Sequence, residues 1–574
     1  MHVRKTAVLF ALLVSLGAAS ASATTINFAS LQAKPPDSSV PGALMAGTSY
    51  TTQGFAIGSC CAGGFDVWKL GNSNFPGTSP AATSLFEMPI RGNQTAITHG
   101  QGQPFTLDSI DFAPLLSGGS GQFNLVVTGD FGDGSQTTQT VWVNNSPFRL
   151  QTVKFSGFIN VVAVYFSQGT NAGYFTGQET AYQFNNIVVN NRYVNGVNGN
   201  DSNDCLSVQT ACQTIGHAIS LASSGDSIMV AAATYKEHLT IGTSVNVLGA
   251  GASTTIVDGG SAATVVRVSA AAHVTLSGLT IRNGFSSKGA GIYNSGSLAV
   301  NNSTVTGNHV SACGGGIGNN GTLTINNSTI SGNRASVNGG GICQTGGMLT
   351  ITNSTLSGNS AQGSSGGGIF NSGSSVTITN STFSGNSAQG SGGGGIFNSG
   401  GTVTITNSTF SSNSALASGG GGVYNNLSGS VTIYNSTFYG NSAQSFGGGI
   451  YAQSGGTGKV TIQNSIVANS TGGNCHGTVT SNGYNLSGDT TCNFSRPGDM
   501  NNVIYSKLGT LGFYGGSTQT IPLLSGSPAI DAGNPGGCTD GHGHLLLTDQ
   551  RGQRRPGGTE TTGCDMGAYE SQTY

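Results

Sequence analysis

The fold is decided by a stretch that recurs along the chain, residues 366–388, which read GGGIFNSGSSVTITNSTFSGNSA. Within it, Val376 and Ile378 alternate with Thr377 and Thr379, and this period of two indicates a β-strand. β-Branched residues favour strands, and runs of glycine disfavour a helix. The stretch contains no charged residue. It therefore predicts a short strand with one apolar face and one face of hydroxyl groups.

Two landmarks of this stretch recur with one period. Steps of 25 to 27 residues separate the apolar residues that end the glycine runs, and steps of 25 to 29 residues separate the asparagines of the N-S-T motif. The apolar landmarks are Ile292, Ile317, Ile342, Ile369, Ile396, Val423 and Ile450. The asparagines are Asn302, Asn327, Asn353, Asn380, Asn407, Asn435 and, in the variant N-S-I, Asn464. A unit this short cannot bury its own apolar face, so neighbouring units must stack.

Stacked units of this kind form a parallel β-helix. Each repeat is expected to make one coil of about three short strands, with successive coils about 4.8 Å apart. We expect Ile369, Val376, Ile378 and Phe383 to fill the interior of one coil. We expect the N-S-T asparagines to lie at bends and to hydrogen-bond to one another in a ladder.

Two parts of the repeat region resemble known families. The pairing of G-G-G-I with F-S-G-N (Phe383–Asn386) resembles the GGA(I/L/V) and FxxN repeats of chlamydial polymorphic outer-membrane proteins over residues 289–470, although glycine replaces alanine here. That resemblance implies a surface protein associated with adhesion. Residues 199–241 resemble the opening of pectin-lyase-like right-handed β-helices. There, Ile215, Ile219 and Leu221 predict a short helix that caps the first coil.

The C-terminal region carries three segments in order: SPAIDAG (527–533), DQRGQRRP (549–556) and CDMGAYE (564–570). Together they resemble the choice-of-anchor Q region of secreted bacterial β-helix proteins, which implies surface attachment or sorting. We expect residues 501–574 to close the last coil. We expect the charged residues there to form ion pairs, Arg551 and Arg555 with Asp549 and Asp565.

The N-terminal part has a different organisation. Residues 1–23 read as a secretory signal, with Arg4 and Lys5 before an apolar run and A-S-A at the cleavage site. Residues 24–191 contain alternating strands separated by turn signals, which predicts an antiparallel β-sandwich of jelly-roll type. Segments such as GFDVWKLGNSNF resemble domains of bacterial proteins exported with PEP-CTERM tails. The aromatic residues Trp68, Trp142 and Tyr182 are candidates to stack on a sugar, or else core residues.

The predicted fold class is therefore all-β. The signal is followed by a sandwich (24–191), a right-handed single-stranded parallel β-helix (192–500) with regular repeats at 289–470, and a C-terminal cap (501–574). Ten cysteines fit an oxidising compartment. Sequence proximity favours three disulfides, Cys205 with Cys212, Cys475 with Cys492 and Cys538 with Cys564. Cys60 and Cys61 form a vicinal bridge or stay free, and Cys313 and Cys343 stay unassigned.

Acidic residues limit where chemistry can take place. Glycoside hydrolases generally need two carboxylates, and calcium-dependent lyases need carboxylate oxygens. Residues 259–488 contain no Asp and no Glu. A catalytic site is therefore predicted only at the first coils, from Asp226, Glu237 and Asp258 with Lys236, and the alternative is that these are turn and surface charges. The sequence indicates no metal and no cofactor, because Asp201, Asn203 and Asp204 suit Asx-turns, and His542 and His544 lack a third ligand.

The predicted function follows from the neutral polar surface. A net charge of -2 gives no indication of a nucleic-acid partner, and no later segment has the length of a transmembrane helix. We expect an exported, secreted or cell-surface protein, adhesin-like and non-catalytic, that offers Asn, Ser and Thr side chains to glycans or matrix. The alternatives are a polysaccharide lyase or hydrolase acting at the first coils, and ice binding. The last rests on paired threonines that resemble those of β-helical ice-binding proteins: Thr350 and Thr352, Thr377 and Thr379, Thr404 and Thr406.

Overall fold

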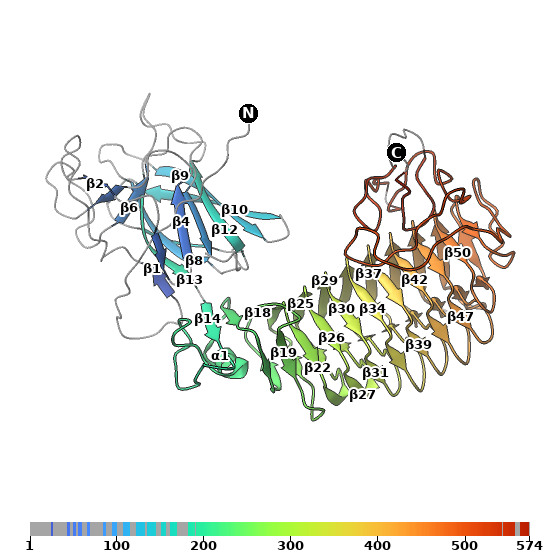
Figure 1. Cartoon of the computed structure of the whole chain (residues 1–574), viewed down its shortest axis with the longest axis horizontal. Coiled ribbons are helices and arrows are strands. Elements are labelled where there is room, and N and C mark those ends of the chain that lie inside the picture. The colour runs from blue at the N-terminus through green and yellow to red at the C-terminus, as the bar shows by residue number, and fades with distance from the viewer. Residues whose placement is uncertain are drawn as a thin grey trace. The chain divides into compact units, whose positions relative to one another are not determined.

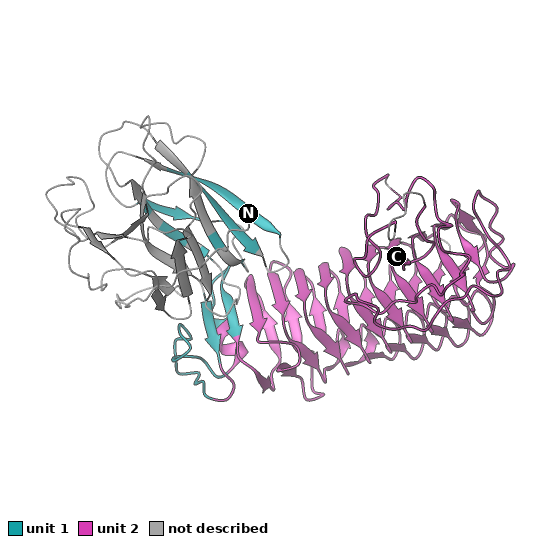
Figure 2. Ribbon diagram, turned by 45° about the horizontal axis from the view of Figure 1, so that its top comes forward, with its two compact units in different colours: residues 1–194, 198–213, 220–229 teal, residues 195–197, 214–219, 230–574 magenta. Residues whose placement is uncertain are grey.

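The computed structural model describes residues 191–426, 428–541, 543–556 and 563–572 continuously, and N-terminal to them the strands β1–β13 with residues 135 and 155. The predicted signal (residues 1–23) and Cys60, Cys61 and His542 lie outside the described residues. The chain divides into two compact units, the first made of residues 1–194, 198–213 and 220–229 and the second of residues 195–197, 214–219 and 230–574 (Figure 2).

The first unit contains two antiparallel sheets, as the sandwich prediction requires (Figure 1). Apolar side chains of both sheets are buried, among them Phe112 of one and Val127 of the other. Sheet A consists of β1 (Thr24–Ile26), β2 (Ala43–Met45), β5 (Asp66–Trp68), β6 (Ser84–Glu87), β8 (Leu107–Pro114), β11 (Gln151–Lys154) and β13 (Tyr182–Val189). Sheet B consists of β3 (Tyr50–Thr52), β4 (Phe55–Ser59), β7 (Thr95–His99), β9 (Gln122–Phe131), β10 (Gln136–Asn144) and β12 (Val161–Gln168).

The second unit is a parallel β-helix whose coils stack in register (Figure 1). Its chain passes in turn through sheets C, D, F and E. Sheet C contains β18 (Val245–Gly249), β21 (His273–Ser277), β25 (Ser297–Asn301), β29 (Thr322–Asn326), β33 (Met348–Thr352), β37 (Ser375–Thr379), β41 (Thr402–Thr406), β45 (Ser430–Tyr434), β49 (Lys459–Gln463) and β52 (Val479–Ser481). Sheet D contains β16 (Ala233–Tyr235), β19 (Thr255–Asp258), β22 (Thr280–Arg282), β26 (Thr304–Thr306), β30 (Thr329–Ser331), β34 (Thr355–Ser357), β38 (Thr382–Ser384), β42 (Thr409–Ser411), β46 (Thr437–Tyr439), β50 (Ile466–Ala468) and β53 (Leu486–Ser487).

Sheets E and F complete each coil. Sheet E contains β17 (Leu239–Ile241), β20 (Val266–Val268), β24 (Ile292–Asn294), β28 (Ile317–Asn319), β32 (Ile342–Gln344), β36 (Ile369–Asn371), β40 (Ile396–Asn398), β44 (Val423–Asn425), β48 (Ile450–Ala452) and β51 (Cys475–His476). Sheet F contains β23 (Phe285–Lys288), β27 (His309–Cys313), β31 (Arg334–Ala335), β35 (Ser360–Ala361), β39 (Ser387–Ala388), β43 (Ser414–Ala415) and β47 (Ser442–Ala443). A regular coil thus has four strands, because sheet F adds a short strand, such as β39 (Ser387–Ala388), to the three expected.

The remaining elements lie at the start of the β-helix sequence. They are β14 (Asn191–Val194), α1 (Ile215–Leu221) and β15 (Ser227–Val230). Helix α1 forms where the apolar pattern predicted it. Ile215 and Ile219 are buried, but Leu221 is 38% exposed.

The core consists of equivalent apolar residues layered from coil to coil. Ile369 pairs with Ile396, and Ile396 pairs with Val423, as the repeat predicts. Phe410 stacks between Phe383 and Phe438, with ring centroids 4.6 Å apart on both sides. All of these side chains are fully buried. Stacking of identical shapes gives close packing without voids, which is the main stabilising contribution in such a solenoid.

The hydrogen-bonded asparagine ladder is not the one that the sequence suggested. The N-S-T asparagines do lie at bends, with φ of +46° to +52°. Among the described residues, however, only Asn464 donates to another of them, from its Nδ2 to Oδ1 of Asn435 at 3.2 Å. The continuous ladder runs through the buried asparagines that end each F-S-G-N-like segment, Asn308, Asn333, Asn359, Asn386, Asn413 and Asn441. The prediction named the wrong asparagines because both sets share one period, and the period alone does not show which set hydrogen-bonds from coil to coil.

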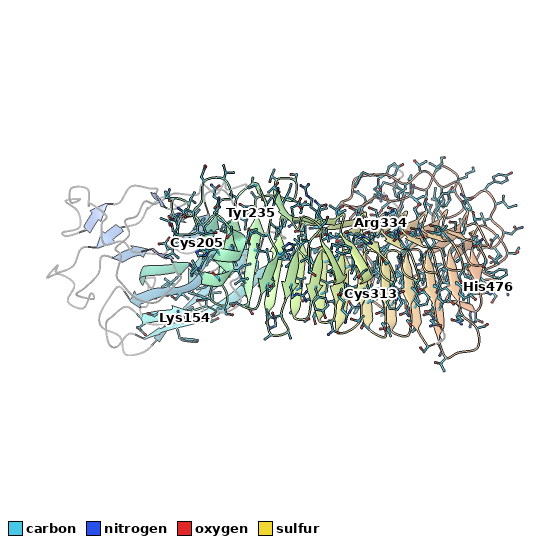
Figure 3. The ribbon with its side chains drawn as sticks, turned by 90° about the horizontal axis from the view of Figure 1, so that it is seen from below. Lys154, Cys205, Tyr235, Cys313, Arg334 and His476 are labelled. Carbon is cyan, nitrogen blue, oxygen red and sulfur yellow. A yellow bond between two sulfur atoms is a disulfide. The ribbon has the colours of Figure 1, made fainter. Side chains whose placement is uncertain are left out.

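Four disulfides are formed in the described part of the chain. Three are the predicted pairs: Cys205–Cys212, Cys475–Cys492 and Cys538–Cys564. The fourth joins Cys313 to Cys343, whose partners the sequence left open. Cys313 lies on β27 and Cys343 on β32, so this bond links adjacent coils (Figure 3).

The C-terminal region does more than close the last coil. It turns back and lies along the outside of the later coils, next to sheets C and D (Figure 1). Arg551 pairs with Asp549 at 2.7 Å, as predicted. Arg555 forms its ion pair with Glu570, at 3.0 Å, and reaches Asp565 only at the backbone carbonyl oxygen. No helix among the described residues has the length and hydropathy to cross a membrane.

Candidate functional site

The first-coil carboxylates are each held by a structural partner. Asp226 is buried and pairs with Arg192, whose Nε lies 3.3 Å from Asp226 Oδ2. The same oxygen accepts a hydrogen bond from the backbone N–H of Ser223 at 3.0 Å. Asp226 therefore fixes a turn and neutralises a buried guanidinium.

Glu237 acts on the N-terminus of helix α1. Its two carboxylate oxygens accept the backbone N–H groups of Ile215 at 2.9 Å and Gly216 at 2.8 Å. A carboxylate in this position satisfies amides that have no partner within the helix. Lys236, which is adjacent in sequence, is exposed.

Asp258 is the third carboxylate. Its Oδ2 lies 2.8 Å from Nε of Arg282, and both of its oxygens accept from Nδ2 of Asn283. Burial acts to raise the pKa of Asp258, but hydrogen bonds from the Gly260 backbone, Arg282 and Asn283 outweigh it and lower the pKa below its ordinary value. Such a group remains ionised and is a poor general acid. The structure therefore gives the three acids three separate structural roles.

The sandwich aromatics do not share one sheet. Trp142 lies on β10 of sheet B, where its side chain is 47% exposed. Trp68 and Tyr182 lie on β5 and β13 of sheet A, where the structure describes the strands but not these two side chains. A sugar site that combines Trp68, Trp142 and Tyr182 remains a prediction.

Metal ligation finds little support in the described part of the chain. Cys205, Cys212 and His217 bring three ligand atoms within 4.8 Å of one another, but the two cysteines form a disulfide and have no thiolate to offer. Asp204 accepts the backbone N–H of Leu206 in an Asx-turn, as expected. His544 pairs with Asp540 at 2.9 Å on the surface.

The outer face of sheet C presents threonines in register. The sequence singled out pairs in three coils, but strand pairing aligns one threonine per coil over a longer distance. This row is Thr324, Thr350, Thr377, Thr404, Thr432, Thr461 and Thr480. The second member of the pairs is aligned through Thr352, Thr379 and Thr406 and then gives way to Tyr434. Neighbouring hydroxyls of the long row are about 4.8 Å apart along the helix axis.

A second row follows sheet D, one bend further along each coil. It contains Thr280, Thr304, Thr329, Thr355, Thr382, Thr409 and Thr437. Each N-S-T motif contributes its asparagine to the bend and its threonine to this row. We call the surface that these asparagines and threonines form between sheets C and D the C–D corner.

The C-terminal region covers only part of the C–D corner. Asn302 and Asn327 are exposed, Asn353 and Asn380 are half-buried, and Asn407, Asn435 and Asn464 are buried. We call Asn302, Thr304, Asn327, Thr329, Asn353 and Thr355 the open half. We call the equivalent residues from Asn380 to Asn464 the covered half.

Sequence reasoning missed a row of rings on the outer face of sheet E. Phe370, Phe397, Tyr424, Tyr451 and His476 stack face to face on successive coils, with centroids 4.6 to 5.6 Å apart. The signal was readable, because each ring follows an apolar landmark or its equivalent by one residue. Each ring from Phe397 to Tyr451 is thus stacked on both faces, and Phe446 also stacks on His476, which is labelled in Figure 3.

A comparison with protein-family models agrees with this architecture. The family model described as "Right handed beta helix region" matches residues 317–495. The chain is similar to a pectate lyase, Pel9A, at 18% identity and a TM-score of 0.39, over 66% of this chain and 96% of that one. It is also similar to the catalytic domain of a GH87 alpha-1,3-glucanase solved with nigerose, at 11% identity and a TM-score of 0.26, over 78% and 98% of the two chains. A search of curated proteins gave no match. The family-model match and the parallel strand pairing together identify a right-handed parallel β-helix in the second unit.

Proposed function

We propose that this chain is a non-catalytic, adhesin-like protein whose β-helix binds neutral glycans or a glycan-containing matrix. The observation that carries the proposal is the outer wall of sheets C and D from β25 to β46, whose strands contain no charged residue and whose threonine hydroxyls and asparagine amides repeat in register over successive coils. No Asp or Glu occurs in residues 259–488. A wall of neutral donors and acceptors suits a neutral polyhydroxylated polymer, because no charge has to be desolvated when it binds.

The competing proposal, a polysaccharide lyase or hydrolase at the first coils, has weaker support. It requires a carboxylate that is available to a substrate, whereas Asp226, Glu237 and Asp258 each bind a structural partner. Glu237 cannot turn toward a substrate without losing its two hydrogen bonds to the backbone amides of α1. The export signal predicted for residues 1–23 is compatible with either role and forms part of this proposal.

The two roles separate in one experiment. Purified protein is incubated with a panel of insoluble and soluble polysaccharides, and both depletion from solution and release of new reducing ends or unsaturated products are measured. We expect retention on at least one neutral polymer with no product above a protein-free control. Product formation that disappears in Asp258→Asn would contradict the non-catalytic proposal, and so would failure to bind any polymer.

Ice binding is a second candidate, because the threonine row of sheet C is longer than the sequence pairs suggested. A flat, regular row of hydroxyl and methyl groups is also suited to ordered water. Thermal hysteresis of the purified protein decides this point. Hysteresis that is lost in Thr377→Lys, together with no retention on any glycan, would favour ice over glycans.

A further inference from the structure

The covered half of the C–D corner shows what this repeating surface binds. Thr382 donates from Oγ1 to the carbonyl oxygen of Gln519 at 2.5 Å. Asn407 donates from Nδ2 to the carbonyl oxygen of Thr548 at 2.9 Å, and Asn435 to that of Thr539 at 2.7 Å. In these three contacts the acceptor is an amide carbonyl. Elsewhere in the covered half, Thr437 Oγ1 and Asn464 Oδ1 accept the backbone N–H groups of Ala568 and Asn534, and Asn464 Nδ2 faces the sulfurs of Cys538 and Cys564.

A side-chain amide occupies the same surface between two coils. Oε1 of Gln550 accepts from Oγ1 of Thr409 at 2.6 Å, and Nε2 of Gln550 donates to Oγ1 of Thr382 at 2.9 Å. Two threonines on neighbouring coils therefore satisfy one buried carboxamide. This is a second instance of amide recognition by the corner, and it shares Thr382 with the first.

The open half carries the same donors. Asn302, Asn327 and Asn353 have the same left-handed backbone conformation as Asn407, with φ of +47° to +49°. Their side chains, and those of Thr304, Thr329 and Thr355, make no hydrogen bond to another described residue. Because backbone conformation and register are shared, the open half presents amide and hydroxyl groups in the arrangement that binds carbonyl oxygens a few coils further along.

The open half differs in one respect from the last coil of the covered half, which contains Ile466 and Ala468. Docking of the C-terminal region also buries an apolar cluster, to which Ile466 and Ala468 of the β-helix and Ala529 and Met566 of the C-terminal region belong. At the positions equivalent to Ile466 and Ala468, the open half has only hydroxyl groups, as in Thr329 and Ser331. Stable docking of a polypeptide depends on apolar burial, which this half does not offer.

We infer that the open half binds an uncharged polysaccharide carrying N-acetyl groups, whose acetamido carbonyl oxygens accept hydrogen bonds from the asparagines and threonines. This inference rests on the proposed glycan-binding function and names both its site and its ligand class. Such a polymer supplies repeated amide carbonyls without needing an apolar surface or a counter-charge. The C-terminal region marks the end of the site, because it occupies the next coils.

The test compares binding to three insoluble polymers: poly-N-acetylglucosamine, its de-acetylated form and cellulose. The full chain is compared with the triple variant Asn302→Gly, Asn327→Gly, Asn353→Gly, since glycine keeps the left-handed conformation. A second variant, Thr304→Val, Thr329→Val, Thr355→Val, removes only hydroxyls. The matched control, Ser360→Ala, Ser387→Ala, Ser414→Ala, removes three hydroxyls from three successive coils of sheet F.

We expect the full chain and the sheet F control to bind the acetylated polymer at least tenfold more tightly than the other two polymers. Both corner variants should lose at least tenfold of that binding while keeping the far-UV spectrum and melting temperature of the full chain. Equal binding to cellulose and the acetylated polymer, or unchanged binding by both corner variants, would overturn the inference but leave the proposed function standing. Absence of binding to any polysaccharide would overturn both. Retention on gelatin that only the corner variants lose would instead assign the corner to polypeptides.

Discussion

Asn407 donates a hydrogen bond from its Nδ2 to the backbone carbonyl oxygen of Thr548, which lies 141 residues later in the chain, at 2.9 Å. The equivalent asparagine three coils earlier, Asn327, is exposed. One residue of the repeat thus fixes the C-terminal region in one coil and faces solvent in another.

The first prediction concerns this contact. Asn407→Gly keeps the backbone conformation but removes the donor to Thr548, so the C-terminal region should lose about 1 kcal/mol of stability. Limited proteolysis within residues 530–556 and guanidinium denaturation measure the loss. Asn327→Gly is the matched control and should change stability by less than about 0.5 kcal/mol. Equal effects of the two substitutions would mean that the contact does not hold the region.

The buried asparagine ladder should be far more sensitive. Oδ1 of Asn386 accepts hydrogen bonds from both the backbone N–H and Nδ2 of Asn359. Nδ2 of Asn386 in turn donates to Oδ1 of Asn413 at 2.9 Å. Asn386→Ala leaves buried donors without acceptors and should cost about 3 kcal/mol or more. Urea denaturation checks this. Ser384→Ala, on the outside of the same coil, should cost less than about 0.5 kcal/mol, and a comparable cost would show that the ladder contributes little.

The stacked phenylalanines provide a packing test. Phe410 is fully buried between Phe383 and Phe438, so Phe410→Ala should destabilise the β-helix by about 3 to 5 kcal/mol. Phe410→Leu leaves a smaller cavity and should cost clearly less. Thermal melting followed by near-UV circular dichroism measures both. If alanine and leucine had the same effect, the stack would not be closely packed.

The C-terminal region should respond to pH through Asp565. Burial raises the pKa of this carboxyl from 3.8 to about 6, although hydrogen bonds from Ser571 and Asp531 and the charge of Arg555 act against the shift. Because the folded pKa lies above the unfolded one, the folded state binds the proton more tightly between these values. Its stability should therefore fall as pH rises from about 4 to 6, by an amount on the order of 3 kcal/mol, and then level off.

The control for this pH effect is Asp565→Asn, which removes the titrating group but keeps one acceptor. Denaturation at pH 4, 5, 6 and 7 should show that the difference between the full chain and the variant changes across this window. Asp258, whose pKa is lowered, is present in both proteins and therefore does not contribute to this difference. A constant difference at all four pH values would contradict the shift assigned to Asp565.

Much of the fold could be predicted because the same pattern of apolar and polar residues recurs in every repeat. Ile369, Ile396 and Val423 lie in one layer as their spacing requires, since only parallel stacking buries a strand with one apolar face. The sequence also indicated three of the disulfides by proximity. It did not indicate Cys313–Cys343, because that bond joins different positions of two coils and follows from their stacking.

The candidate site was less predictable. The sequence grouped Asp226, Glu237 and Asp258 as possible catalytic acids, but their partners, Arg192, the amides of α1 and Arg282, are set by the fold. The sequence indicated the threonine pairs of sheet C but not the full length of the row that begins at Thr324. Where Tyr434 replaces the second threonine of the pair, the pair is lost, although the first threonine continues as Thr432.

The sequence by itself determined the stacked coil, its apolar interior and its uncharged wall, because these follow from local periodicity that every repeat restates. Only the tertiary structure decided which repeats remain open. The C-terminal region folds back over coils whose asparagines and threonines are almost identical to those it leaves exposed. That choice depends on the apolar residues Ile466 and Ala468 at the far end of the β-helix, where burial of Met566 and Ala529 favours docking.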